Sequence, residues 1–445
     1  MMTEQTNGRS DFVVGLGATG LSIARYLHRK ELKATFFDTR TEPPGVDELR
    51  SLFPDAQLLL GSVKLPSHVR RVIASPGVSD SHPIFRDART ARVEIVSDIE
   101  LFVREAQAPF IAITGSNGKS TVTTLLYHMC RAAGLKVYAG GNLGEPALDL
   151  LEKPTPQVYV LELSSFQLQR TTNLPARVSI LLNVTPDHLD WHASVNEYRA
   201  AKYRVFREAK AAVFNRADAT AAAAAKVAER TISFGADEPG EGQYGLRVDD
   251  GVTYLARGDK LLLSTDDLAM YGRHNQLNAL AALAAGSLAG LDLASMLMVL
   301  CEFPGLPHRM EFVRQVGGVD YVNDSKATNV AAAVAAVDSV DGELVLVAGG
   351  DGKGGDFRPL ADALENKLRA AVLIGKDAQA ISDALDTVHP VYFADDMNEA
   401  VDTASAYAEP GDTVLLAPAC ASLDQYRNYM ARGDAFAEAV MGLRE

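Results

Sequence analysis

A glycine-rich segment with a single lysine, ITGSNGKST, occupies residues 113–121 between an apolar stretch and a helix-forming one. In loops of this kind the backbone N–H groups surround phosphates, the lysine bridges their oxygens and the next hydroxyl binds Mg2+. Lys119 and Ser120 stand at those two positions, so we predict a loop that binds the phosphates of ATP. Ile113 replaces the first glycine of the general pattern. The alternative, a glycine turn that binds nothing, leaves the complete strand, loop and helix context unexplained.

Two polar segments, ELSSFQL at 162–168 and NVTPDHLDWH at 183–192, each begin at the end of an apolar stretch that is typical of a strand. Open parallel sheets bind ligands at the carboxyl ends of their strands, so we expect both segments beside the phosphate loop. Glu162 is the candidate Mg2+ ligand next to Ser120, because an acidic residue after a second strand completes such sites. His188 lies between two aspartates in a polar loop, which favours a functional histidine over a structural one.

A second glycine turn, GLGATG at residues 15–20, follows the first apolar stretch, and Asp38 closes the next one. By itself this spacing predicts an NAD-dependent dehydrogenase. The same turn also holds the diphosphate of other nucleotides, and a chain that already carries an ATP loop favours that interpretation. We then expect Asp38, Thr39 and Arg40 at the nucleoside end of the ligand. A turn that only packs its helix against the sheet is the remaining alternative.

The order of apolar stretches, glycine turns and helical stretches predicts three α/β domains in the 445 residues. Residues 1–97 form a Rossmann-like domain, residues 98–305 a P-loop domain, and residues 306–445 a second Rossmann-like domain. Within the P-loop domain we expect an Ala-rich surface helix near 217–229 and a short antiparallel β excursion at 235–260.

The composition, 47% hydrophobic and 22% charged, is typical of a chain that buries large cores. The formal net charge of −14 disfavours nucleic acid as a partner. The polar, acidic start predicts no secretion signal or organelle leader, so we expect a cytoplasmic protein. Residues 279–300 are rich in Ala and Leu but interrupted by Gly, Ser and Asp, which predicts two buried helices and no membrane span. For the three cysteines we expect buried free thiols: Cys130, Cys301 and Cys420.

A set of motifs extends through all three predicted domains: SPGV, TGSNGKST, ELSSFQL, NVTPDHLDWH, YRAAK, GRHNQLNALAA, GLPHRME, NDSKATN and GGDGKGGDF. As a set they resemble the motifs of the Mur ligases. The N-terminal glycine turn with DTR, and the C-terminal PACASLDQYRNY, are most similar to the family members that join D-glutamate to UDP-N-acetylmuramoyl-L-alanine. The resemblance implies an ATP-dependent ligase of peptidoglycan precursor synthesis, which forms an amide bond through an acyl phosphate.

The resemblance also implies three groups of ligand-binding residues. The residues expected to bind ATP are Gly115, Ser116, Asn117, Gly118, Lys119, Ser120, Thr121, Asn275, Asn278, Arg309 and Asp324. Those expected to bind the UDP-linked precursor are Ala18, Thr19, Asp38, Thr39, Arg40, Ser75, Pro76, Gly77 and Asn142. Those expected to bind glutamate, with Lys326 assisting, are Thr328, Lys353, Ser422, Leu423 and Tyr429. Tyr429 stands where the family pattern has phenylalanine.

Two Mg2+ sites follow from the same resemblance, the first between Ser120, Glu162 and the phosphates and the second at His188. In the family the second ion also contacts a lysine carbamylated by carbon dioxide, which corresponds to Lys202 of EYRAAKYRVF. Carbamylation turns an ammonium that repels the ion into an oxygen ligand. From residue type and helical setting alone, Lys202 reads as a solvated surface lysine.

Three alternatives remain beside the D-glutamate ligase. An amide ligase of the same superfamily would add another amino acid or extend folate with glutamate. An NAD-dependent dehydrogenase would use the N-terminal turn and leave the ATP loop idle. A nucleotide-binding switch would bind ATP without forming a product. We expect a monomer that acts on small molecules only.

Overall fold

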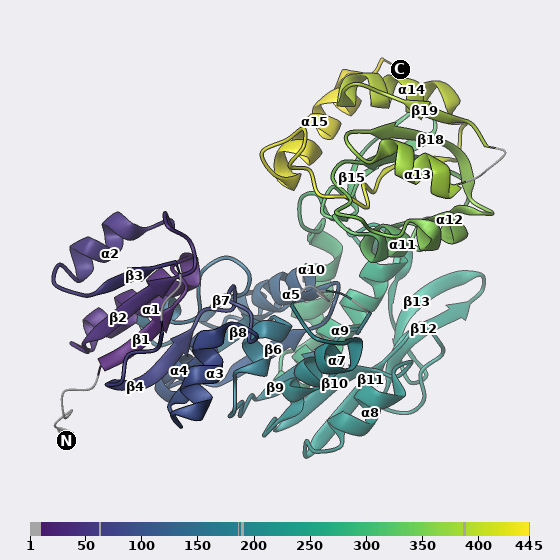
Figure 1. Cartoon of the computed structure of the whole chain (residues 1–445). Helices are drawn as coiled ribbons and strands as arrows, with labels where there is room; N and C mark the ends of the chain where they lie inside the picture. The colour runs from purple at the N-terminus through teal and green to yellow at the C-terminus, as the bar shows by residue number, and fades with distance from the viewer. Residues whose placement is uncertain (1–9, 62–63, 186, 188–190, 386–388, 445) are drawn as a thin grey trace. The chain divides into compact units, whose positions relative to one another are not determined.

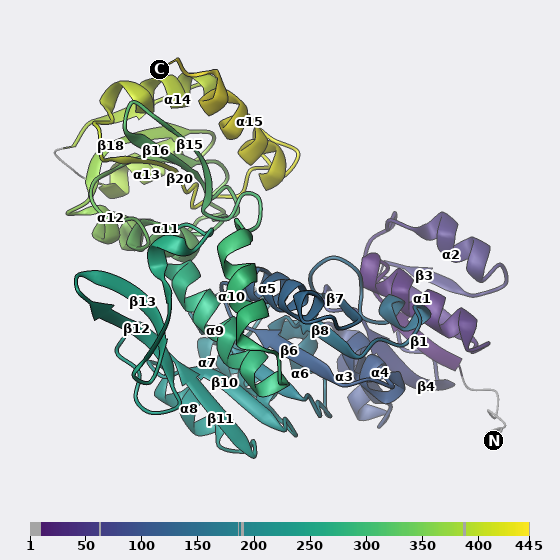
Figure 2. The same ribbon diagram turned by 180° about the vertical axis from the view of Figure 1, so that it is seen from behind.

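The computed structural model describes residues 10–61, 64–185, 187, 191–385 and 389–444. The chain divides into two compact units. Unit 1 comprises residues 1–235, 242–244 and 281–296, and unit 2 comprises residues 236–241, 245–280 and 297–445. Helices cover the sheets in both units (Figures 1 and 2).

The first sheet is fully parallel and lies in unit 1, with strand order β3-β2-β1-β4-β5. Its strands are β1 (Ser10–Val14), β2 (Ala34–Asp38), β3 (Leu58–Leu60), β4 (Val69–Ala74) and β5 (Glu94–Ser97). Its helices are α1 (Ala18–Arg29), α2 (Val46–Leu52) and α3 (Pro83–Thr90). The chain order reverses at β1, so the carboxyl ends of β1 and β4 flank the position where such sheets bind ligands.

The second sheet carries the phosphate loop, and its part in unit 1 has the order β11-β10-β9-β6-β8-β7. These strands are β6 (Phe110–Thr114), β7 (Val137–Gly141), β8 (Val158–Glu162), β9 (Val178–Leu181), β10 (Ala211–Asn215) and β11 (Arg230–Phe234). The accompanying helices are α4 (Asp98–Glu105), α5 (Lys119–Ala132), α6 (Ser165–Gln169), α7 (Val195–Tyr203) and α8 (Ala219–Ala225), with 3-10 turns η1 (Asp149–Glu152) and η2 (Arg204–Phe206). Strand β6 runs between β8 and β9, which places the loop after β6 next to the ends of both neighbours.

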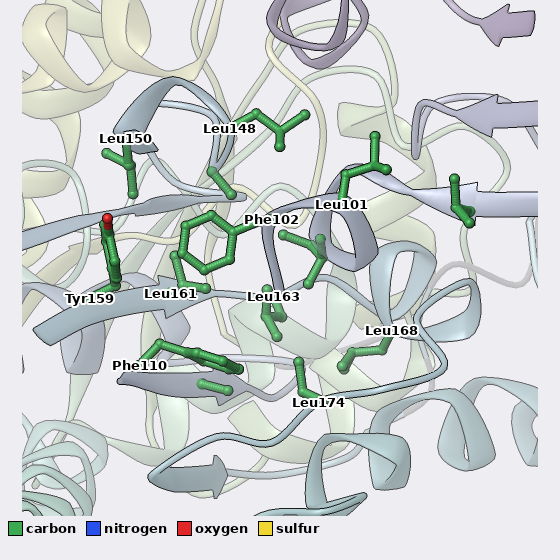
Figure 3. Close-up of a cluster of buried hydrophobic side chains, with 14 of the residues drawn as sticks. Leu101, Phe102, Phe110, Leu148, Leu150, Tyr159, Leu161, Leu163, Leu168 and Leu174 are labelled. Atoms are coloured by element: carbon green, nitrogen blue, oxygen red, sulfur yellow. The ribbon is translucent and has the colours of Figure 1, made fainter. Parts of the chain in front are cut away.

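One continuous apolar cluster joins these two sheets inside unit 1. Phe102 of α4 meets Tyr159 of β8 edge to face, with ring centroids 5.1 Å apart. Leucines from η1, β8, the following loop and α6 surround this pair (Figure 3). Fully burying a Leu or Phe side chain contributes roughly 1.5–3 kcal/mol, so this cluster is a major source of stability for unit 1.

Residues 244–302 confirm two local predictions. Strands β12 (Tyr244–Asp249), β13 (Val252–Arg257) and β14 (Lys260–Ser264) occupy the expected excursion, and β13 pairs antiparallel with β14. A short 3-10 turn, η3 (Thr265–Asp267), follows. The Ala- and Leu-rich segment forms the two helices α9 (Arg273–Ala289) and α10 (Leu293–Glu302), whose apolar residues are largely buried. Among the described residues, no helix combines the length and the apolar character that crossing a membrane requires.

The third sheet lies in unit 2 and has the order β15-β16-β20-β17-β18-β19. Its strands are β15 (Glu311–Val316), β16 (Val319–Asn323), β17 (Leu344–Gly349), β18 (Leu368–Ile374), β19 (Val391–Phe393) and β20 (Thr413–Leu416). Its helices are α11 (Val330–Asp338), α12 (Arg358–Leu364), α13 (Ala378–Leu385), α14 (Met397–Tyr407) and α15 (Tyr429–Gly442). The other strands are parallel, but β15 pairs antiparallel with β16 through a two-glycine turn whose φ angles are positive.

The fold corrects one expectation and leaves another as a prediction. Cys130 and Cys420 are buried as expected, but Cys301 is exposed, because the last turn of α10, where Cys301 and Glu302 lie, is open to solvent. The exact boundaries at residues 97/98 and 305/306 stay predictions.

Candidate active site

The predicted phosphate loop joins β6 to α5 and is held from the side by the chain after β9. Gly118 begins α5 with a φ of +81°, a conformation that glycine adopts without strain. The N–H of Asn117 donates to Asn183 Oδ1 at 2.8 Å, and Asn183 Nδ2 donates back to the Asn117 carbonyl at 3.1 Å. Ser116 Oγ donates to the Thr185 carbonyl at 3.0 Å. The loop is therefore preorganised by protein contacts.

The Lys119 ammonium folds back across this loop. Its Nζ donates to the carbonyls of Gly115 and Ser116, both at 2.8 Å. The Lys119 side chain therefore lies over the loop. In P-loop proteins the lysine at this position contacts the phosphate oxygens. Ser120 follows in the first turn of α5 and is almost fully buried. The geometry matches the arrangement predicted for residues 115–121, and their contacts with ATP stay a prediction.

Glu162 is the last residue of β8, and β8 lies next to β6, the strand that leads into the phosphate loop. It pairs with Ile113 on one side and with Gly141 of β7 on the other. The Glu162 carboxylate is buried; its Oε1 accepts from Asn142 Nδ2 at 2.6 Å, while its Oε2 has no hydrogen-bond partner among the described residues. A buried carboxylate oxygen without a donor is costly unless a cation or another donor meets it.

Lys202, expected from residue type to be solvated, is instead buried in α7 and only 2% exposed. Its Nζ donates to the Gly115 carbonyl at 2.7 Å and lies 4.8 Å from the centre of the Tyr198 ring. Burial, with the nearby Lys119 ammonium adding repulsion, lowers the pKa of Lys202 well below its usual value. The structure thus brings Lys202 to the same loop as Lys119, while its carbamylation stays a prediction.

The second predicted metal ligand, His188, lies outside the described residues. Asp187 is described and is close enough to act electrostatically on Lys202. Within the described ranges there is no group of three or more His, Cys, Asp or Glu side chains that would hold a metal alone. Both predicted Mg2+ sites therefore stay predictions.

Most of the predicted precursor residues gather at the carboxyl end of the first sheet, whereas Asn142 follows β7 of the second sheet. Ala18 and Thr19 open α1, Asp38 ends β2, and residues 75–77 follow β4, so the strand order brings them together. The backbone is tightly packed here: a Cβ on Gly20 would lie 1.9 Å from the Gly15 carbonyl oxygen. The glycine turn therefore requires glycine for close contact between helix and strand, whatever ligand it binds.

Asp38 organises this edge. Its Oδ2 accepts from the Leu16 N–H at 2.7 Å, and Arg40 donates through Nε and Nη2, both at 2.8 Å. Hydrogen bonds from Arg40 and the backbone outweigh the effect of burial and lower the pKa of Asp38. The carboxylate thus holds both the glycine turn and the Arg40 side chain in place. Its contact with a nucleoside stays a prediction.

In unit 2, two of the residues predicted to bind ATP, Asn275 and Asn278, lie near the start of α9. Asn275 Nδ2 donates to the Tyr271 carbonyl at 2.8 Å, and Asn278 Nδ2 donates to Asn275 Oδ1 at 3.0 Å. Both side chains are nearly buried. The structure therefore places the two asparagines side by side in one short hydrogen-bonded chain.

The predicted glutamate residues follow three neighbouring strands of the third sheet, β16, β20 and β17. The Lys326 ammonium lies 4.3 Å from the centre of the Tyr429 ring, a cation–π distance. Ser422 is buried, whereas Leu423 is 69% exposed. Lys353 is exposed and adopts a φ of +50°, an uncommon conformation for a side-chain-bearing residue. Thr328 and Arg309 lie on the loops that flank this edge.

Asp324 gives this edge a testable pH dependence. Burial raises the pKa of its carboxyl to about 7, against the Met310 N–H, Arg309 and Lys326, which lower it. An acid with a raised folded-state pKa binds its proton more tightly when folded, so unfolding free energy falls as pH rises from about 4 to about 7, by up to roughly 1.4 kcal/mol per pH unit.

We expect Asp324→Asn, which copies the shape of the protonated acid, to remove this fall. In urea unfolding of the ligand-free protein, the advantage of the variant over the wild type should grow from about pH 4 to about pH 7. Equal changes in the two proteins over that range would contradict the assignment.

Several residues that build the loop were not predicted from the sequence. Asn183 and Thr185 hold the loop backbone, and the Tyr198 hydroxyl meets Ser116 Oγ at 2.7 Å. Arg170 joins the first and second sheets. Asn183 opens a motif that was recognised, but no spacing signal singles out Tyr198 or Arg170.

A buried parallel sheet, a lysine-bearing phosphate loop and an adjoining buried carboxylate together define an α/β enzyme that uses a nucleoside triphosphate. Three family models match the chain: the N-terminal domain of MurD-like Mur ligases at residues 9–97, the Mur ligase middle domain at 113–286, and the Mur ligase glutamate ligase domain at 308–420. The chain belongs to the Mur ligase family. It is an ATP-dependent ligase that forms amide bonds.

Within the family, full-length relatives are named for one reaction. UDP-N-acetylmuramoylalanine--D-glutamate ligase of Legionella pneumophila (strain Paris) is 47% identical over 440 residues, 97% of this chain and 98% of that one. The protein of the same name from Marinobacter nauticus is 46% identical, covering 99% of this chain and 100% of that one. The structure of MurF ligase from Thermotoga maritima in complex with ADP has the same three-domain fold, with a TM-score of 0.62 at 16% identity and 99% coverage of both chains.

Proposed function

We propose that this chain joins D-glutamate to UDP-N-acetylmuramoyl-L-alanine at the expense of ATP, a step of peptidoglycan precursor synthesis. The full-length identity of 46–47% to ligases named for this reaction supports the substrates. The site supports the chemistry, because a preorganised phosphate loop lies beside a buried carboxylate and two lysines. We place the reaction in the cytoplasm, where ATP is available, and expect a monomer.

The first step transfers the γ-phosphoryl group of ATP to the alanyl carboxylate, which gives an acyl phosphate and ADP. Two anions must approach each other, so the site has to supply positive charge. Lys119 and the N–H groups at the start of α5 provide it, where the helix dipole adds to the field. In phosphoryl transfer such positioning and charge stabilisation account for most of the catalysis.

Glu162 and Ser120 are the residues we expect to hold Mg2+. The fit rests on the buried Glu162 Oε2, which has no donor among the described residues, and on the serine hydroxyl that follows Lys119. The donor set of carboxylate and hydroxyl oxygens is the kind that Mg2+ prefers. When bound, the ion neutralises charge on the phosphates. Asn142 holds the other oxygen of Glu162 and so fixes the direction in which Oε2 points.

We assign Lys202 as the site of a carbamate formed with carbon dioxide. Carbon dioxide adds only to a neutral amine, and the amine loses one proton as the carbamate forms. Lys202 is buried beside Lys119, an environment that favours the uncharged amine. The resulting carboxylate would supply an oxygen ligand for the second Mg2+ that the resemblance implies. This assignment rests on the resemblance, and the burial of Lys202 supports it.

The glutamate amine then attacks the acyl phosphate, and phosphate leaves from the tetrahedral intermediate. Lys326 and Lys353 carry the positive charge we expect to meet the carboxylates of glutamate, while Ser422 offers a hydroxyl. The precursor is expected at the edge formed by residues 15–20, 38–40 and 75–77. Water must be kept from the acyl phosphate, which would otherwise hydrolyse.

The observation that carries the proposal is the meeting of Lys119, Glu162 and Lys202 around one loop. It is tested by phosphate release with UDP-N-acetylmuramoyl-L-alanine, ATP and each glutamate enantiomer in turn. We expect release with D-glutamate and little with L-glutamate. Release with another amino acid, or with a folate and L-glutamate, would assign the chain to a different ligase. Nicotinamide turnover would revive the dehydrogenase alternative, and tight ATP binding without product would favour a switch.

A further inference from the structure

Arg170 is a buried arginine that no step of the proposed reaction uses. It follows α6, and its side chain is 3% exposed. Burying a guanidinium is costly, and this burial lowers the pKa of Arg170. A charge is retained in such a position only where several groups of the protein surround it.

Those groups belong to the loop after β4. Arg170 Nη1 donates to the Ser75 carbonyl at 3.0 Å, Nη2 donates to the Val78 carbonyl at 2.5 Å, and Nε donates to Asp80 Oδ1 at 2.9 Å. The planar guanidinium therefore spans residues 75–80 from inside. It fixes the backbone of the segment in which Ser75, Pro76 and Gly77 are expected to contact the precursor.

The same side chain touches the aromatic residues of two further segments. Its guanidinium carbon lies 4.4 Å from the centre of the Phe85 ring and 5.4 Å from that of Trp191. Trp191 packs on Phe166 of α6, with ring centroids 4.4 Å apart. Arg170 thus contacts both the loop of residues 75–80, which is expected to bind the precursor, and the end of the NVTPDHLDWH segment.

Helix α6 connects this contact to the metal-binding carboxylate. The helix starts three residues after Glu162, and Ser164 and Gln167 close a capping box at its first turn. Gln167 Nε2 also donates to Asp98 Oδ2 at 3.0 Å, and Thr171 Oγ1 lies 2.9 Å from Ser97 Oγ. Helix α6 is therefore a rigid, doubly anchored element between Glu162 and Arg170.

We infer that Arg170 is a positioning residue that sets the loop of residues 75–78 relative to Glu162 and thereby controls how the precursor is held. This inference rests on the proposed function for the identity of the precursor. Kinetic measurements distinguish this role from a purely structural one. Loss of a residue that only stabilises the fold lowers the fraction of active enzyme, whereas loss of a positioning residue changes the KM for one substrate.

The test compares Arg170→Lys and Arg170→Ala with the wild type. Lysine keeps the charge but lacks the planar fork, so it cannot make the three contacts together. We expect the KM for UDP-N-acetylmuramoyl-L-alanine to rise about tenfold in Arg170→Lys and more in Arg170→Ala, with the KM for ATP within about twofold. Asp80→Asn, which keeps the shape and removes one charge, should raise the precursor KM by a smaller factor of about three.

Arg25→Gln is the matched control. Arg25 of α1 also joins elements of the first and second sheets, because its Nη2 lies 2.5 Å from Asp149 Oδ2 of η1. It does not contact residues 75–80. We expect its precursor KM to stay within about twofold of wild type.

Calorimetric titration with the precursor separates the possible failures. If the wild type does not bind the precursor, the proposed function falls and this inference with it. If the wild type binds and all three variants at Arg170 and Asp80 bind equally well, the function stands and the positioning role is overturned. If Arg170→Ala does not fold, Arg170→Lys and Asp80→Asn decide the question by the same criterion. A rise of precursor KM in Arg25→Gln equal to that in Arg170→Lys would also overturn it.

Discussion

Lys119→Ala loses ligase turnover by a factor on the order of 10²–10³ or more, while it still binds the UDP-linked precursor. The reason is local. Lys119 carries the positive charge that lies over the loop through the Gly115 and Ser116 carbonyls, and the charge is needed when the γ-phosphoryl group moves. We expect precursor binding to depend on the first sheet, which this substitution does not touch. Phosphate release and calorimetric titration with the precursor measure the two quantities separately.

Lys136→Ala is the control, because Lys136 is an exposed lysine that directly precedes β7 of the same sheet. Its turnover should match the wild type. Lys119→Arg tests whether charge alone suffices, and we expect it to remain strongly impaired because the guanidinium does not fit the tight contacts at 2.8 Å. Near-normal turnover of Lys119→Ala would remove the loop from the mechanism.

Lys202→Ala loses turnover by about two orders of magnitude, and added bicarbonate does not restore it. Wild-type protein stripped of carbon dioxide should lose activity and recover it on adding bicarbonate. The buried amine at 2.7 Å from the Gly115 carbonyl is the group that we expect to react. Carbon-13 NMR after incubation with labelled bicarbonate gives a readout apart from activity, with a carbamate signal in the wild type and none in the variant.

Lys210→Ala serves as the matched control, since Lys210 is an exposed lysine shortly after α7. It should keep both the carbamate signal and the response to bicarbonate. If the wild type is indifferent to carbon dioxide and shows no carbamate signal, Lys202 is only a buried structural lysine that hydrogen-bonds the loop.

Much of the fold follows from local sequence patterns. The turn at residues 15–20 and the loop at residues 115–118 mark two βα starts, and the apolar runs between them leave little choice other than parallel strands. The position of Glu162 next to the phosphate loop can also be predicted from the sequence. The carboxyl ends of neighbouring parallel strands lie at the same edge of the sheet, and Glu162 ends such a strand. Strand β15 was missed because a short alternating strand before a two-glycine turn gives a weak signal beside the stronger α/β alternation.

The parts of the candidate site that depend on tertiary packing are harder to predict from the sequence. Lys202 lies in a short helix that also carries Asn196, Glu197 and Arg199, so its burial arises from packing against the loop and not from the pattern of α7. Tyr198 and Arg170 are polar residues whose partners lie 82 and more than 90 positions away in the chain. The prediction for Cys301 was wrong in the opposite sense, because a residue at the end of an apolar helix can still be exposed to solvent.

The most direct test of the central claim, transfer of phosphate from ATP to a carboxylate, is isotopic. The precursor is prepared with 18O in its alanyl carboxylate and turned over with ATP and D-glutamate, and the released phosphate is analysed by mass spectrometry. The proposed chemistry predicts one 18O atom in each phosphate released. Phosphate without the label, formed together with the glutamyl product, would contradict it.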